Sequence, residues 1–517
     1  MTSSTRLLLA LLLALFLGRI ALTWRVFNDT IDEQGHLSAG LQYLQTAHYT
    51  YEPEHPPLGR LVLTALPYFV AGMRFHPNLW AYDGPWATHD LSYYWYTLTL
   101  ARAGNLLFAV LVFFFVWRWS SLLHGPGAAL AACAIVACCP SLLGLAAFAT
   151  LDFAAVAAFL VPAFFLWRWA GEPSWRRALA AGAACGLAVL VKFSALVLLP
   201  PLALIYFTLA RRLPWKQLPS TVLLAAVIVW AGYRFEVGSL APAGHNFRGK
   251  YPEGQQSGLP LLLTRTLQHR TLPAPRAFHG LIDLASHNRA GHNAYLLGRT
   301  AQHGWWYYFP IAILLKTTIP LLLLLALSFY RPILPSLYPL TAVALVVGLA
   351  MSSNLNLGLR YVLPIYPLLA IVAGGLFVRP GRLRVVAVVL LAWHGLESVR
   401  AHPDYLGYFN QWPRGREHRY LADSNLDWGQ DLARLAQYAR DHRLGDLQLS
   451  YFGPADPAKF GLRARKLNWA QPDPGWIAVS VNHTLGIQND PAPARWLWHL
   501  EPRAKIGKSI WLYYFEK

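Results

Sequence analysis

The chain has 517 residues, of which 55% are hydrophobic and only 13% are charged. Soluble proteins carry about 25% charged residues, so this composition excludes a soluble globular protein. The net charge of +19 does not indicate a nucleic-acid partner, because the charge of the short loops between the predicted spans is distributed by membrane side. The four cysteines lie within apolar segments and therefore predict no disulfide framework.

Apolar segments recur through the first four hundred residues, and crossing the hydrocarbon core takes about 20 residues. We predict eleven spans, at approximately 7–27, 99–117, 126–144, 152–168, 177–191, 194–210, 218–235, 307–329, 334–351, 361–378 and 383–399. The first span is expected to be a retained signal anchor, because no small-residue cleavage site follows it. The apolar segment 58–72 is short and contains Pro67, so it is expected to be a membrane-associated helix within the first loop.

Basic residues fix the predicted orientation. With the N-terminus inside, the cytoplasmic loops and ends have one acid, Glu172, and these basic residues: Arg6, Arg118, Arg168, Arg176, Arg177, Arg211, Arg212, Lys216, Arg331, Arg379, Arg382 and Arg384. Such an excess is typical of the cytoplasmic side. Two large loops, 28–98 and 236–306, and the C-terminal tail are therefore expected outside.

The tail has the pattern of a small α/β domain. Asp427 is a candidate N-cap for a helix over Trp428–Arg440. Leu447–Phe452, Trp476–Val481 and Ser509–Phe515 are predicted strands. We therefore expect a transmembrane domain over residues 1–399 and an extracytoplasmic α/β domain over residues 400–517.

Charged residues and histidines gather on the predicted outer side, where polar groups beside apolar helices indicate function. The first loop contributes Asp32, Glu33, His36, Glu54 and His55. The ends of the spans contribute Arg102, Asp152, Lys192 and Arg360, and Lys316 lies about ten residues into the eighth span. Simpler explanations exist for several of them: Asp32 and Glu33 as solvated loop residues, Asp152 as an N-cap, and Lys192 and Arg360 as snorkelling side chains.

Carboxylates beside fixed cations at the bilayer surface suit the transfer of a sugar from a lipid-linked phosphate. Arginine and lysine can hold the phosphate and stabilise its charge as it leaves. A carboxylate can remove the proton of an acceptor hydroxyl that attacks the anomeric carbon. The histidines between residues 279 and 303 allow a two-histidine metal site, although no tight ligand spacing supports one.

Short motifs resemble those of a known family. Asp32-Glu33 followed by Glu54-His55-Pro56-Pro57-Leu58-Gly59-Arg60 resembles the Asp-Glu pair and the His-Pro-Pro-Leu-Gly-Lys signature of protein O-mannosyltransferases, with Arg60 in place of the lysine. More broadly, the chain resembles GT-C glycosyltransferases that use polyprenyl-phosphate sugars, including lipid A aminoarabinose transferases. Thr150-Leu151-Asp152, the segment 356–361 and the segment 423–431 also resemble bacterial members.

The resemblance implies a role for each candidate. Asp32 would be the catalytic base, Glu33 would shape the acceptor site, and Asp152 would be the second acid of the site. Residues implied to hold the donor phosphate are Arg102, Lys192 and Arg360. Residues expected to contact substrate are His36, His55, Lys316 and Tyr361.

The expected protein is thus an all-α polytopic membrane protein of the GT-C type, with an extracytoplasmic tail domain. It would be an inverting glycosyltransferase of the bacterial inner membrane, moving one sugar from a polyprenyl-phosphate donor to a hydroxyl of a glycan, lipid or protein acceptor. No cofactor is expected, although a divalent metal is possible. Nucleic acid is not expected among the partners. The alternatives are a polysaccharide ligase or polymerase with a diphosphate-linked donor, and a lipid-linked sugar transporter.

Overall fold

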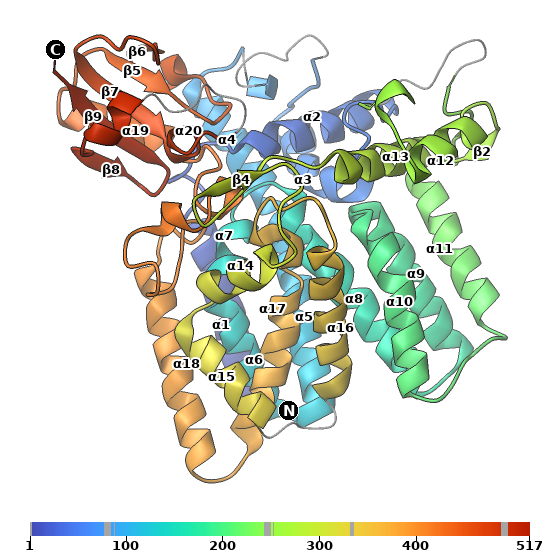
Figure 1. Cartoon of the computed structure of the whole chain (residues 1–517). Helices are drawn as coiled ribbons and strands as arrows, with labels where there is room; N and C mark the ends of the chain where they lie inside the picture. The colour runs from blue at the N-terminus through green and yellow to red at the C-terminus, as the bar shows by residue number, and fades with distance from the viewer. Residues whose placement is uncertain are drawn as a thin grey trace.

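The computed structural model describes residues 3–76, 84–86, 88–241, 250–251, 253–330, 336–487 and 495–516. It has three parts: a bundle of long helices below, a layer of shorter helices above it, and a tail that contains a sheet (Figure 1). Arg331, one of the basic residues predicted on the cytoplasmic side, lies outside the described residues.

The bundle combines helices from both halves of the chain (Figure 1). Those of the first half are α1 (Ser3–Ala21), α5 (Asn105–His124), α6 (Pro126–Ala137), α8 (Leu151–Gly171), α9 (Trp175–Val191), α10 (Ser194–Leu209) and α11 (Leu218–Gly232). Those of the second half are α15 (Ile319–Tyr330), α16 (Leu337–Met351), α17 (Ile365–Gly374), its 3-10 extension η5 (Gly375–Val378) and α18 (Arg382–Arg400). Helical structure lies at the position of each predicted span.

Length and composition identify fewer spans than the sequence pattern predicts. Three helical segments are long and apolar enough to cross a membrane: Ser3–Ala21, Leu91–His124 and Leu151–Gly171. The number rises to five if two bent pairs each count as one span, Pro126–Ala137 with Pro140–Ala146 and Tyr308–Lys316 with Ile319–Tyr330. For the described part of the chain, the total of eleven spans therefore stays a prediction.

The predicted eighth span, residues 307–329, is a broken helix and not a continuous one, and whether it counts as one span stays a prediction. Helices α14 (Tyr308–Lys316) and α15 meet at a bend of 113°. Pro320 has no N–H with which to bond the carbonyl of Lys316, so the helical ladder stops there. That carbonyl accepts a hydrogen bond from Ser141 Oγ at 3.1 Å instead. Lys316 therefore lies at a bend and not along a continuous span.

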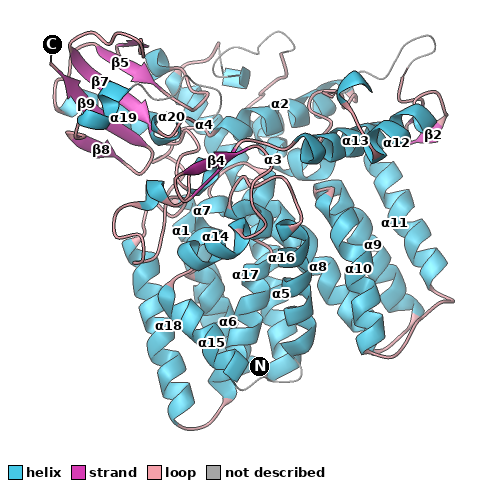
Figure 2. Ribbon diagram, in the orientation of Figure 1, coloured by secondary structure: helices cyan, strands magenta, loops and turns pink. Residues whose placement is uncertain are grey.

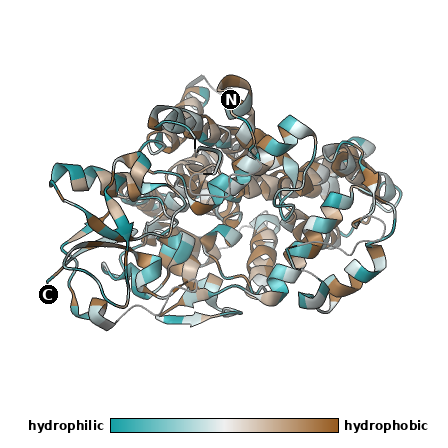
Figure 3. Ribbon diagram, turned by 90° about the horizontal axis from the view of Figure 1, so that it is seen from above, coloured by the Kyte–Doolittle hydropathy of each residue, from teal (hydrophilic) through white to brown (hydrophobic). Residues whose placement is uncertain are grey.

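The upper layer is built mainly from the two large loops. Its helices are α2 (Ile31–Thr46), α3 (Pro57–Val70), α4 (Leu91–Ala103), α12 (Leu259–Leu267) and α13 (Pro275–Ala290), and α7 (Pro140–Ala146) and α14 lie at the top of the bundle. Two short antiparallel ribbons pair β1 (Val237–Gly238) with β2 (Leu272–Pro273) and β3 (Ala294–Leu296) with β4 (Arg299–Ala301). Seen from above, these elements and the tail have many hydrophilic residues (Figure 3).

The tail folds around a mixed sheet, which has most of the strands in Figure 2. Its strands are β5 (Leu447–Ser450), β6 (Ala464–Lys466), β7 (Gly475–Ser480), β8 (Ala504–Ile506) and β9 (Ile510–Phe515), in the order β6-β5-β7-β9-β8. Strand β5 runs parallel to β6 and β7, and β9 is antiparallel to β7 and β8. Three of these strands lie where strands were predicted.

The predicted tail helix begins later than expected. Helix α19 spans Leu432–Asp441, and the residue before it is Asp431, not Asp427. Gly429 has a φ of +82°, a left-handed conformation that breaks any helix through Trp428. Asp427 and Asp431 bond to other parts of the tail, as described below. The prediction that Asp427 caps a helix over Trp428–Arg440 was therefore wrong.

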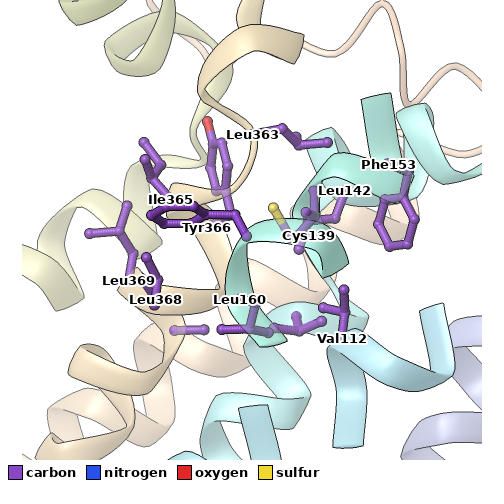
Figure 4. Packing of buried hydrophobic residues seen from close by; sticks show 14 of the residues in the cluster. Val112, Cys139, Leu142, Phe153, Leu160, Leu363, Ile365, Tyr366, Leu368 and Leu369 are labelled. Atoms are coloured by element: carbon purple, nitrogen blue, oxygen red, sulfur yellow. The ribbon is translucent and has the colours of Figure 1, made fainter. Parts of the chain in front are cut away.

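The main apolar core lies where α5, α7, α8 and α17 meet (Figure 4). Helix α17 is buried along its whole length, and Leu368 lies close to Leu160 of α8 in the figure. Cys139 is a buried free cysteine in the same cluster, among apolar side chains. This packing fixes the start of α8 and the 3-10 turn η4 (Leu359–Val362) before α17, which carry residues of the site described next.

Candidate active site

A buried ion pair between Glu33 and Arg102 holds the turn at the start of α2, where Asp32 lies. The Glu33 and Arg102 side chains are fully buried, and two N–H groups of Arg102 donate to the two oxygens of Glu33, each at 2.9 Å. Glu33 also forms a capping box with Thr30 at the start of α2. Arg102 donates further to the backbone carbonyls of Trp24, Phe27 and Asn28. The pair therefore holds the turn that leads into Asp32.

A cavity of about 390 Å³ lies where α2, α8, α10 and α13 meet the loops before α3 and α17. Its charged and histidine lining consists of Asp32, His36, Glu52, Glu54, His55, Asp152, Lys192, Lys250, His287, His292, Arg360 and Asp423. Its apolar lining includes Ala155, Ala158 and Phe159 of α8 and Ala195 and Leu198 of α10. These apolar residues lie up to two turns beyond Asp152 and Lys192 along their helices, so the apolar part extends into the bundle.

Four charged side chains form a line across the cavity, which we call the charge row. Lys192 Nζ lies 2.7 Å from one oxygen of Asp152, and Arg360 Nη1 lies 3.5 Å from the other. The same Arg360 nitrogen forms an ion pair with Asp32. Arg360 Nε is buried and has no hydrogen-bond partner among the described residues. The charges of this row thus alternate in sign, and one N–H donor of Arg360 has no partner among the described residues.

Aromatic rings flank the cations of the charge row. The guanidinium of Arg360 lies 4.9 Å from the ring centre of Trp428, and Lys192 Nζ lies 5.9 Å from that of Tyr361. Both rings belong to residues that line the cavity. They limit the directions in which the two cations can turn.

The segment 54–60, which resembles a family signature, helps to position two uncharged histidines, His36 and His55. Arg60 is fully buried, donates to His36 Nδ1 at 3.2 Å and pairs with Glu52 at 3.0 Å. Burial, reinforced by the nearby cation of Arg60, lowers the pKa of both His36 and His55, so both rings are neutral near pH 7. At Gly59 a Cβ atom would lie 2.6 Å from the side chain of Leu151, which explains why α3 carries glycine where it meets α8. Arg60 itself does not line the cavity; it holds His36 and Glu52, which do.

The large loop between α11 and α14 covers one side of the cavity. Lys250 forms an ion pair with Glu54 at 3.0 Å, and His287 Nε2 lies 3.2 Å from His292 Nδ1. Burial lowers the pKa of His287 to about 4, which keeps that ring neutral. Within the described residues, no group of three or more His, Cys, Asp or Glu has an arrangement that could hold a metal ion.

Three residues predicted for the site lie outside the cavity: Glu33, Arg102 and Lys316. Lys316 is buried, and its Nζ donates to two backbone carbonyls, those of Leu406 and Asn425, each at 2.6 Å. Its charge therefore ties the bend after α14 to the start of the tail. Lys316 and Arg102 do not line this cavity, and the assignment of both to ligand contacts stays a prediction.

Comparison with known proteins identifies the fold. Residues 97–233 match the family model described as dolichyl-phosphate-mannose-protein mannosyltransferase. Crystal structures of ArnT from Cupriavidus metallidurans are similar to the chain, with undecaprenyl phosphate bound (TM-score 0.54, 13% identity, 97% of each chain covered) and in the apo state (0.53, 14%, 99% and 98%). The archaeal oligosaccharyltransferase AglB from Archaeoglobus fulgidus is more distant, with a TM-score of 0.46, 10% identity and coverage of 93% of this chain and 70% of that one. A search of curated proteins gives no significant match.

The chain has the GT-C fold. It is a multi-pass membrane protein, as its apolar helices also indicate. The predicted resemblance to GT-C proteins is thereby confirmed. At this level of identity the solved structures establish the architecture, and the chemistry of the site has to be argued from its residues.

The cavity also includes residues that the sequence analysis gave no role. Asp423 and Trp428 come from a segment that only resembled a tail element of bacterial relatives, and Glu52 and Lys250 carried no distinguishing pattern. The available signal was the density of polar residues in 423–431 directly before a helix. That signal favoured a helix N-cap at Asp427, whereas in the structure Trp428 of this segment packs against Arg360 of the charge row.

Proposed function

We propose that the protein is a glycosyltransferase that moves a sugar from a polyprenyl-phosphate donor to an acceptor hydroxyl. The observation that carries this proposal is the charge row, Lys192–Asp152–Arg360–Asp32, at the point where a polar cavity becomes apolar. A lipid with an anionic headgroup has the same division between charged and apolar parts. A soluble sugar nucleotide does not require the apolar part.

Lys192 and Arg360 would hold the donor phosphate. The unpaired Nε of Arg360 supplies a donor, and two adjacent cations favour a phosphate that gains charge as it leaves. The prenyl chain would run along Ala155 and Phe159 of α8 and Leu198 of α10. Asp152, the second acid, would hold the two cations in place and offset their mutual repulsion before the donor binds.

Asp32 would be the catalytic base. Its Oδ2 pairs with Arg360, and its other oxygen, Oδ1, has no hydrogen-bond partner among the described residues. That oxygen would accept the proton of the acceptor hydroxyl while the acceptor oxygen bonds to the anomeric carbon. The bond from that carbon to the phosphate oxygen breaks in the same step, and polyprenyl phosphate leaves. A single displacement of this kind inverts the anomeric configuration.

We propose further that the cavity faces outward from a bacterial inner membrane, because the short loops and ends on the predicted cytoplasmic side hold twelve basic residues, whereas the short turns on the opposite side hold only Lys192 and Arg360. The acceptor would be a glycan, lipid or protein with a free hydroxyl. His36, His55 and Tyr361 line the cavity and would contact the sugar or the acceptor. Transfer is expected to proceed without a divalent metal, because Lys192 and Arg360 can neutralise a monophosphate.

Equilibrium binding of undecaprenyl phosphate to the purified protein tests the donor site. Lys192→Gln and Arg360→Gln should each weaken binding by about tenfold or more, since a charge-assisted hydrogen bond contributes about 1.5–3 kcal/mol. Arg265→Gln is the matched control, because it removes an arginine that pairs with Glu253 away from the cavity. Equal binding by the native protein and the Arg360→Gln variant would refute the proposed donor site.

A second arm separates the base from the binding residues. Asp32→Asn should bind undecaprenyl phosphate at least as well as the native protein and transfer no sugar from a polyprenyl-monophosphate donor. Full transfer by that variant would remove the base assignment. Tighter binding of undecaprenyl diphosphate than of the monophosphate would favour the alternative, a ligase or polymerase with a diphosphate-linked donor.

A further inference from the structure

Residues 423–431, which we call the junction segment, connect the bundle to the tail sheet and contact both the loop that carries Arg360 and the turn that precedes Asp32. On one side the segment binds the loop that carries Arg360. Asn425 Oδ1 accepts a hydrogen bond from the Leu359 N–H at 3.0 Å, and Ser424 Oγ donates to the carbonyl of Leu357. These bonds flank Arg360, whose guanidinium also lies on the Trp428 ring.

Close packing leaves little freedom at this contact. Gly358 has a φ of +119°, and a Cβ atom there would lie 2.4 Å from Ser424 Oγ. The loop can therefore approach the junction segment this closely only because residue 358 is glycine. Any shift of the segment would displace the backbone on which Arg360 stands.

On its other side the junction segment binds the turn that carries Asp32. The Ile31 N–H donates to the carbonyl of Trp428 at 3.3 Å, and Asn28 Nδ2 donates to the carbonyl of Gly429 at 2.8 Å. Ile31 directly precedes Asp32 in the chain. Nearby residues of the junction segment thus hold both the turn before Asp32 and the loop that carries Arg360.

The tail sheet anchors the junction segment at two points. The Asn482 N–H donates to Asp427 Oδ2 at 3.1 Å, its Nδ2 donates to the Asp427 carbonyl at 2.9 Å, and its Oδ1 accepts from the Asp423 N–H at 2.9 Å. Asp431 Oδ2 accepts from the N–H and the hydroxyl of Ser509, at 3.1 and 2.8 Å. Asn482 follows β7 and Ser509 precedes β9, so the ends of two adjacent strands grip the segment.

We propose that the tail sheet, acting through the junction segment, sets the position of Arg360 relative to the α2 turn that carries Asp32. In this arrangement Asn425 and Trp428 are positioning residues, because they act on the reacting groups through Arg360 and the α2 turn. The tail is then a working part of the site, and a molecule that binds the tail can change the site without entering the cavity. The link to catalysis rests on the proposed glycosyltransferase function, whereas the mechanical link does not.

Hydrogen exchange measured by mass spectrometry tests the mechanical link on the full chain. Asn482→Ala removes two side-chain hydrogen bonds to the junction segment from a residue that does not line the cavity. Exchange should rise by about fivefold in peptides covering residues 28–36 and 356–362, as expected for the loss of hydrogen bonds. Ser509→Ala, which removes a single bond to Asp431, should give a smaller rise in the same peptides and serves if Asn482→Ala does not fold.

Gln448→Ala is the matched control. Gln448 is a buried residue of β5 that bonds to Asp473 within the tail and not to the junction segment. It should weaken the sheet and leave exchange in residues 28–36 and 356–362 unchanged. An equal rise in the control, or no rise in Asn482→Ala and Ser509→Ala, would overturn the proposal.

Undecaprenyl phosphate affinity, measured on the same preparations, supplies the functional arm. Asn482→Ala should bind this lipid several-fold more weakly than the native protein and the Gln448→Ala control. If exchange rises as expected but the native protein itself does not bind the lipid, the mechanical link stands and the proposed donor is wrong. If the native protein binds and Asn482→Ala binds equally well, the positioning role is refuted.

Discussion

The buried pair of Glu33 and Arg102 offers a direct test of whether Arg102 supports the fold or binds substrate. Substituting Arg102 by methionine would leave the carboxylate of Glu33 buried without its cation. Breaking a buried ion pair in this way costs about 3–5 kcal/mol. The three backbone carbonyls of residues 24, 27 and 28 would lose their donor as well, which places the expected loss at the upper end of that range.

Two further variants calibrate this loss. Arg102→Met combined with Glu33→Gln removes both charges and should recover at least half of the lost stability, because no unpaired charge stays buried. Arg102→Lys keeps the charge but not the paired donors, and it should fall between the native protein and Arg102→Met. The measurement is the free energy of unfolding in SDS–detergent mixtures, followed by tryptophan fluorescence.

Lipid binding then separates the two roles of Arg102. Folded Arg102→Met protein should bind undecaprenyl phosphate with an affinity close to the native value, because Arg102 does not line the cavity. Native stability together with a tenfold loss of affinity would refute the reasoning, since that combination describes a residue that holds the phosphate.

Further substitutions examine other contacts. Lys316→Met should destabilise the protein by about 1–3 kcal/mol, because two buried carbonyls lose their donor, and should leave the affinity for undecaprenyl phosphate unchanged in the folded fraction. Gly358→Ala should lower the thermal unfolding midpoint and weaken lipid binding together, because its Cβ would clash with Ser424; an unchanged midpoint would contradict the close approach. The lowered pKa of His36 means that the unfolded chain binds the proton more readily, so stability is fully present above about pH 6.5 and is lost as the pH falls below it. His36→Gln should therefore flatten the pH dependence of thermal unfolding between pH 7 and 5, and an equally steep dependence in that variant would assign the effect to other groups.

The sequence by itself determined the membrane class, the GT-C resemblance and the four residues of the charge row. Asp32, Asp152, Lys192 and Arg360 each stand beside a long apolar segment, where a charge is costly unless it has a partner or a function. That cost makes such residues visible in a single sequence. Their meeting in one cavity follows from the bundle, whose helix ends share one level.

Tertiary structure alone decided which charged residues face the cavity. Asp32 and Glu33 are neighbours on a helix, where successive side chains point about 100° apart, so one faces the cavity and the other faces Arg102. The sequence alone does not distinguish Asp32 from Glu33. Lys316 looked equally functional in sequence, but the bend at Pro320 turns it toward backbone carbonyls instead.

The junction segment shows the same limit over a longer distance. Trp428 meets Arg360 across 68 residues of chain and meets Ile31 across almost 400, and no local pattern encodes contacts of that range. Local propensity favoured a helix through Trp428, and hydrogen bonds from two strand ends outweighed it. Periodicity and charge therefore indicated the membrane class and the candidate residues, while packing between distant segments decided which of these residues share one cavity.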